Sequence, residues 1–118
     1  MDRPRFIKFG DLFTPPPNGY NSDIEYIVLA TLNRGMFNTS SIRRSEGSVV
    51  IVGTMGTGDW RIVDKITGSL GLEEIIQALH RSRTYNNPIF QESLKSMIEF
   101  VTAESTKPPL RLVRLKDH

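Results

Sequence analysis

The spacing of apolar residues changes near residue 70, and this change separates a strand-rich first part of the chain from a helical second part. Residues Ser48–Val52 form a short β-branched run next to glycine, which is the pattern of a buried strand. Leu72, Ile75, Ile76 and Leu79 recur at the spacing of an amphipathic helix. The sequence therefore predicts an α+β fold, with an antiparallel β-meander of three to five strands packed against two helices in the C-terminal half.

Three further strands are predicted from weaker signals. Residues 24–32 are rich in β-branched and aromatic side chains, which favours a strand, although residues 21–23 could also cap a helix there. Residues 37–44 alternate in character and predict an exposed strand, and residues 60–66 predict another. Ser45–Gly47 is predicted to be the turn between two of these strands.

Charged and capping residues mark the ends of the two helices. The first helix is expected to begin near Ser69 or Gly71, with acidic residues in its first turn and basic residues at its end, an order that favours the helix dipole. The second is expected to begin at Asn87–Pro88, a cap followed by a proline at the first helical position. Residues 110–115 are either a last strand or an arm.

Residues Gly53–Gly58 form a glycine-rich corner, and corners of this kind often hold phosphates. A phosphate-binding loop would continue with a lysine and a hydroxyl residue into a helix, whereas Asp59 and Trp60 follow here and lead into a predicted strand. The carboxylate of Asp59 would also repel phosphate. The corner is therefore predicted to be a hairpin loop that reverses the backbone between two neighbouring strands.

The 118 residues suit a single domain, and the net positive charge of the chain lies at its two ends. A proline-rich N-terminal arm is predicted over residues 1–22, and one α+β domain with a basic C-terminal segment over residues 23–118. Residues 1–8 hold three basic residues against one acidic residue, and residues 107–118 hold four against one. If the two ends lie side by side, they form one basic patch; two solvated tails are the alternative.

The residues that metal binding and catalysis require are scarce. The chain has no cysteine, and its two histidines, His80 and His118, have no spacing that suits a metal. We predict no metal site, no cofactor and no catalytic residue. An enzyme is the less favoured class, and it would need a site that is assembled only on folding.

Two groups of side chains are predicted to make contacts with other molecules. Arginines that occur in close pairs are expected to contact anions or nucleic acid: Arg43, Arg44, Arg81, Arg83, Arg111 and Arg114. Apolar and aromatic side chains on the arm and near the glycine-rich corner are expected to contact a partner, with Trp60 as the aromatic anchor: Phe6, Phe9, Phe13, Tyr20, Met55 and Trp60.

The favoured hypothesis is a non-enzymatic binding or assembly module that forms homo-oligomers and contacts an acidic protein partner. The first alternative is RNA or DNA binding, which the formal net charge of only +2 argues against. A compact body with basic ends and a proline-rich arm is also typical of viral matrix and accessory proteins, although no motif identifies such a family. The second alternative is the small enzyme described above.

Membrane insertion and secretion are not expected. No apolar run approaches the length that spans a bilayer, and the N-terminus lacks the apolar stretch of a secretion signal. The expected location is the cytoplasm of a cell or of an infected host cell. Peripheral contact with an acidic membrane stays open.

Overall fold

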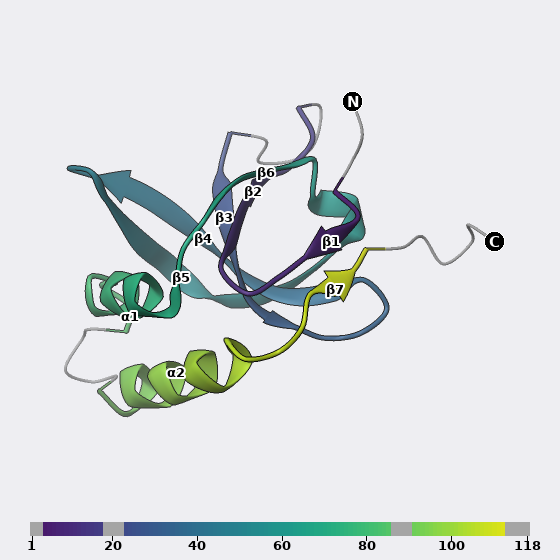
Figure 1. The fold of residues 1–118 in the computed structure, drawn as a ribbon. Coiled ribbons are helices and arrows are strands. Elements are labelled where there is room, and N and C mark those ends of the chain that lie inside the picture. The colour runs from purple at the N-terminus through teal and green to yellow at the C-terminus, as the bar shows by residue number, and fades with distance from the viewer. Residues whose placement is uncertain (1–3, 18–22, 86–90, 113–118) are drawn as a thin grey trace.

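The computed structural model describes residues 4–17, 23–85 and 91–112, in which two antiparallel sheets are joined to two α-helices (Figure 1). The predicted α+β fold is confirmed. The predictions for Tyr20, for the helix start at Asn87–Pro88 and for Arg114 lie outside the described residues.

The larger sheet has five strands, and only part of it is a simple meander. In spatial order its strands are β5 (Ser48–Asp59), β4 (Met36–Ser45), β3 (Glu25–Thr31), β2 (Asp11–Thr14) and β6 (Lys65–Ser69). Strands β2 to β5 follow one another along the chain. Strand β6 then returns to the far edge and pairs with β2.

The glycine-rich corner was predicted to reverse the chain, and this prediction is wrong. Residues Gly53–Gly58 continue β5, so that Gly56 pairs with Thr39 and Gly58 with Phe37. The register shifts between Thr39 and Ser41, because three residues of β5 stand opposite one residue of β4. Gly53, with φ of +76°, lies in this bulge. The glycine therefore serves a β-bulge rather than a hairpin turn.

The chain reverses between β4 and β5 at the predicted turn instead. Glu46 and Gly47 both have positive φ, at 50° and 79°, as the two central residues of a type I′ hairpin turn require. The predicted strand at residues 60–66 is only partly present, because Trp60–Ile62 form a short 3₁₀ helix (η1) before β6 begins. The side chain of Asp59 accepts a hydrogen bond from the Arg61 N–H and caps this helix.

Strands β3 and β4 lie deep in the molecule. The expected strand at residues 24–32 is confirmed, and its residues 27–30 are all buried. Residues 37–44 also form a strand, but they are not exposed throughout: Phe37, Thr39, Ser40 and Ile42 are buried. The hydroxyls are satisfied there, since Thr39 Oγ1 donates to the Ile27 carbonyl at 2.7 Å. Burial of serine and threonine is stable when such bonds form, which explains the departure from the prediction.

Two hydrophobic clusters lie on opposite faces of the larger sheet. Alternate residues of β3 enter different clusters, because neighbouring side chains of a strand point to opposite faces. Ile27 and Leu29 join the cluster that packs against α1 (Leu72–His80) and α2 (Gln91–Glu104), as Figure 1 shows for the helices. Val28 joins the second cluster, with Phe13 and Phe37.

The smaller sheet joins the two ends of the described chain. Its strands β1 (Phe6–Ile7) and β7 (Leu110–Arg111) are antiparallel and lie beside each other in Figure 1. Strands β1 and β2 fall within the range that was predicted to be an arm. Ile7 and Phe13 are 1% and 0% exposed, so this range contributes to the folded body. The proline run that suggested an arm begins only after β2 ends.

Candidate functional site: an arginine hollow

Three of the predicted arginines come together from two distant segments. Arg43 lies near the end of β4, Arg81 caps the C-terminus of α1, and Arg83 lies in the turn that follows. All three line one hollow of about 290 Å³, together with the hydroxyl residues Ser45, Ser82 and Thr84 and residues 50–53 of β5. This site is called the arginine hollow here.

Local hydrogen bonds fix the turn that carries two of the arginines. The Arg81 N–H donates to the Gln77 carbonyl at 3.1 Å, and the Ser82 N–H donates to the Leu79 carbonyl at 3.1 Å. Tyr85 is only 7% exposed and belongs to the cluster beneath the helices. The turn is therefore anchored at both ends, so Arg81 and Arg83 extend from a fixed backbone.

The positive charge of the arginine hollow is not compensated by the residues that line it, since none of them is acidic. Arg81 bonds to neutral acceptors: its Nη1 lies 3.4 Å from the Val49 carbonyl oxygen, and its Nη2 lies 3.2 Å from Gln77 Oε1. Within the described residues, the side chains of Arg43 and Arg83 form no ion pair and no hydrogen bond. Three arginines in the lining of one small hollow suit an anion, because a guanidinium presents several N–H donors in a planar fork.

Arg44 lies next to this hollow, but its charge is already neutralised. Its Nε and Nη2 donate to the two carboxylate oxygens of Glu25 at 3.1 and 3.0 Å. Partial burial raises the pKa of Glu25, but hydrogen bonds from Thr67 and Arg44 and the Arg44 charge outweigh it, so the pKa lies below its ordinary value. Arg44 also lines an adjacent hollow of about 280 Å³, together with Arg81 and the acidic Glu74.

The fifth described arginine of the predicted set does not join the site. Arg111 lies on β7, which Figure 1 places on the other side of the molecule from α1. The six predicted arginines thus divide into three that line the hollow, one neighbour paired with an acid, one distant residue and Arg114, which is outside the described chain.

The side chains predicted to contact a partner do not form one surface. Phe13 is fully buried between Tyr26, whose ring centroid lies 5.6 Å away, and Phe37 at 5.5 Å, so it has no surface to offer. Phe9 and Met55 are half-buried and pack against the cluster beneath the helices. The half-buried residue Trp60 begins η1, where its backbone N–H donates to the Gly35 carbonyl.

Phe6 is the exposed member of this set among the described residues, at 56%. The hydroxyl residues Ser45, Ser82 and Thr84 were not predicted to be part of a site. Ser82 is 0% exposed, and no local pattern marks a serine in a helix-ending turn as buried. Ser45 lies at the β4–β5 hairpin, and Ser82 and Thr84 lie in the turn after α1. These three residues come together only when the hairpin and the turn pack against each other in the folded chain.

Other kinds of site find little support in the described part of the chain. There, no three His, Asp or Glu side chains gather as a metal site would require. No described helix combines the length and the apolar character needed to cross a lipid bilayer.

Comparison with models of protein families, with curated protein sequences and with solved structures gives no match.

Proposed function

We propose that this protein is a non-enzymatic binding module that contacts an acidic segment of a partner protein through the arginine hollow. The observation that carries the proposal is the convergence of Arg43, Arg81 and Arg83 around a hollow with no acidic residue in its lining. An anion in the hollow would be attracted by these positive charges, because the lining contains no acidic residue that neutralises them. Each hydrogen bond between a guanidinium and a carboxylate is stronger than one between neutral groups.

A protein segment is favoured over nucleic acid by the surroundings of the hollow. Binding to single-stranded RNA or DNA combines phosphate contacts with aromatic side chains on which bases stack. Tyr85 is buried in the core, and Trp60 belongs to a different element, so neither provides a stacking surface in this lining. The formal net charge of +2 is also small for a protein that relies on many phosphates.

The test is the binding of a fluorescein-labelled octaglutamate peptide to the full-length protein, measured by fluorescence anisotropy at low salt. The double variant Arg43→Gln/Arg83→Gln removes two charges and leaves the exposed side chains similar in size. We expect it to bind the peptide at least about tenfold more weakly, because two sets of charge-assisted hydrogen bonds are lost.

Arg34→Gln provides the matched control, because Arg34 is exposed and lies in the turn between β3 and β4. We expect this variant to bind within about twofold of the wild type, since exposed charges act weakly at a distance. Equal weakening in the control and the double variant would contradict the proposal. Tighter binding to a labelled single-stranded DNA or RNA 12-mer, with a steep decrease as salt rises, would support the nucleic-acid alternative instead.

The proposal also includes self-association, which one edge of the larger sheet supports. Strand β6 pairs with β2 on one side only, and all five of its residues are exposed. Ile66, 36% exposed, is the large apolar residue in this strand. An uncovered edge strand can pair with the same edge of a second copy and extend the sheet across a two-fold axis.

The molecular mass in solution, measured by light scattering, tests the proposed self-association. If β6 forms the contact, the wild type is a dimer at micromolar concentration, and Ile66→Lys shifts it to monomer because a charge enters the interface. The substitution Leu32→Lys, at an exposed apolar residue in the β3–β4 turn, is the control and should leave the mass unchanged. A monomeric wild type would reject self-association without affecting the arginine hollow.

A further inference from the structure

We propose that the paired ends of the chain form a second docking surface, separate from the arginine hollow. Its ligand is an acidic peptide segment of a partner protein that inserts one bulky apolar side chain. The surface is defined by Phe6, Lys8, Pro109 and Arg111. It shares no residue with the arginine hollow, so the two proposals can fail independently.

Strand pairing places basic and apolar side chains of the two ends next to each other. Phe6 is paired with Arg111, and Ile7 with Leu110. Paired residues in antiparallel strands project from the same face. Ile7 is buried in the cluster beneath this sheet, so Phe6 and Arg111 share the opposite face, toward solvent. The Leu112 N–H donates to the Arg5 carbonyl at 2.7 Å and continues the pairing.

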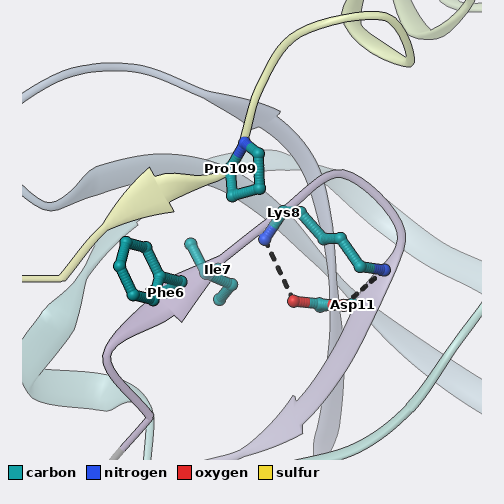
Figure 2. A pocket seen from close by; sticks show the side chains of 5 residues that line it. All are labelled: Phe6, Ile7, Lys8, Asp11 and Pro109. Atoms are coloured by element: carbon teal, nitrogen blue, oxygen red, sulfur yellow. Dashed lines mark hydrogen bonds and ion pairs between the residues drawn. The ribbon is translucent and has the colours of Figure 1, made fainter.

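A hollow of about 550 Å³ opens beside this pair, and its lining is mostly apolar. Figure 2 shows Phe6, Ile7 and Pro109 around it, with Lys8 extending toward Asp11. Phe6 is 56% exposed, the largest exposed fraction among the large apolar side chains of the described residues. An exposed phenyl ring next to an apolar hollow gains free energy when another apolar group covers it. The lining thus suits a large aliphatic or aromatic side chain.

The charges near this hollow favour an acidic ligand, because the local acids are already paired. Asp11, whose side chain is 9% exposed, accepts from the Lys8 backbone N–H at 3.0 Å and lies 3.1 Å from Lys8 Nζ. Glu104 is paired with Lys107 at 2.7 Å, shortly before Pro109. Within the described chain, Arg111, which shares the face of Phe6, forms no ion pair. One uncompensated positive charge therefore remains beside the exposed ring.

A peptide suits this surface better than a membrane does. Peripheral membrane binding relies on several apolar side chains that enter the lipid together. The other large apolar side chains that are exposed in the described residues lie on different elements: Leu32 and Met36 near the β3–β4 turn, and Ile66 on β6. One ring beside one concave hollow matches a single inserted side chain with acidic neighbours.

The experiment uses the full-length Arg43→Gln/Arg83→Gln protein, so that an acidic probe is not held by the arginine hollow. The probe is a fluorescein-labelled nonapeptide with one Phe between two runs of four Glu. A second peptide carries Ser in place of this Phe. We expect the Phe peptide to bind at least about fivefold more tightly, because only it fills the apolar hollow.

Two substitutions in the same background test the protein side. Phe6→Ser should weaken binding of the Phe peptide about fivefold to tenfold and bring it close to the Ser peptide, whose binding should hardly change. Arg111→Gln should weaken the binding of both peptides by a similar factor, because this substitution removes a charge and leaves the apolar hollow intact. Leu32→Ser, at a residue that is 46% exposed elsewhere, is the control and should bind as its parent does.

The proposal is overturned if the two peptides bind equally well, or if Leu32→Ser weakens binding as much as Phe6→Ser. It is also overturned if the protein does not bind the Phe peptide but binds phosphatidylcholine–phosphatidylserine vesicles in a manner that depends on Phe6, since the ligand is then a membrane. The three substituted residues are all exposed, so an unchanged thermal midpoint is expected and confirms that each variant is folded.

Discussion

At the scale of single residues, Gly10 illustrates how one backbone position holds several elements together. Its N–H donates to the Val28 carbonyl and its carbonyl accepts from the Leu70 N–H, both at 2.9 Å. Its φ is +89°, and a Cβ atom added to it would lie 2.2 Å from the Leu70 carbonyl oxygen. Glycine is therefore required both by the conformation of the backbone and by the space around it.

Gly10→Ala should lower the free energy of unfolding by at least about 2 kcal/mol, since it adds backbone strain to a steric clash. Urea denaturation followed by circular dichroism measures the change. Gly56→Ala is the matched control, because a Cβ there meets nothing within 4 Å. Its effect should stay within about 1 kcal/mol in either direction. Similar losses in both variants would show that the contact with Leu70 is not the cause.

The pairing of Glu25 with Arg44 makes a second prediction, on pH. The pKa of Glu25 lies below its ordinary value of 4.5 in the folded chain, so the folded state favours the charged form. Its contribution is present above the pKa of the unfolded chain and is lost as the pH falls through the lower folded value.

Glu25→Gln should therefore be less stable than the wild type at pH 7, by about 1 kcal/mol or less because Arg44 is exposed to solvent. The difference should shrink as the pH falls below about 4.5. Thermal unfolding at pH 7 and at pH 3 provides the comparison. A difference that stays constant between these pH values would show that the charge of Glu25 is not involved.

At the scale of elements, the sequence identified the strands better than it identified their ends. Ser48–Val52 is a strand as predicted, but β5 continues through the glycines to Asp59. A glycine with positive φ serves a hairpin turn and a β-bulge equally well, and local sequence does not distinguish the two. The hydroxyls of Ser40 and Ser41 both donate to the Val52 carbonyl next to the bulge, a contact between strands that local patterns do not reveal.

The start of α1 offers a test of a single helix-end contact. The carboxylate of Glu74 accepts a hydrogen bond from the Gly71 N–H at 3.1 Å, which satisfies a free donor before the first turn. Glu74→Ala should lower the free energy of unfolding by about 0.5–1 kcal/mol. Glu73→Ala is the control, since Glu73 lies in the same turn and is also exposed. Equal losses in the two variants would assign the effect to the helix dipole alone.

At the scale of the whole molecule, contacts between segments far apart in the sequence form both the hydrophobic cluster around Phe13 and the arginine hollow. Residues 6–7 pair with residues 110–111 across nearly the full length of the chain. The sequence predicted one basic patch only on the condition that the ends meet. Residues 6–7 and 110–111 do pair, whereas Arg3, Arg114 and Lys116 lie outside the described residues, so the patch stays a prediction. The α+β class followed from local periodicity. The convergence of Arg43 with Arg81 and Arg83 did not, because it depends on the packing of α1 against β5.

The ends should therefore matter for global stability. Ile7→Ala should lower the free energy of unfolding by about 2–4 kcal/mol, because Ile7 is 1% exposed and its loss leaves a cavity in the second cluster. Phe6→Ala, at the neighbouring exposed residue, should change it by less than about 0.5 kcal/mol. Denaturation in guanidinium chloride measures the change in the free energy of unfolding for both variants. A small effect at Ile7 would mean that β1 is not part of the cooperative fold.

The most direct test of the arginine hollow is an NMR titration of the ¹⁵N-labelled full-length protein with octaglutamate, observed at the arginine Nε–Hε resonances. We expect the resonances of Arg43, Arg81 and Arg83 to shift together and to saturate with one dissociation constant, while that of Arg34 stays in place. Shifts of similar size at all exposed arginines, without saturation, would contradict this expectation, because the peptide would then bind the surface only through general charge attraction.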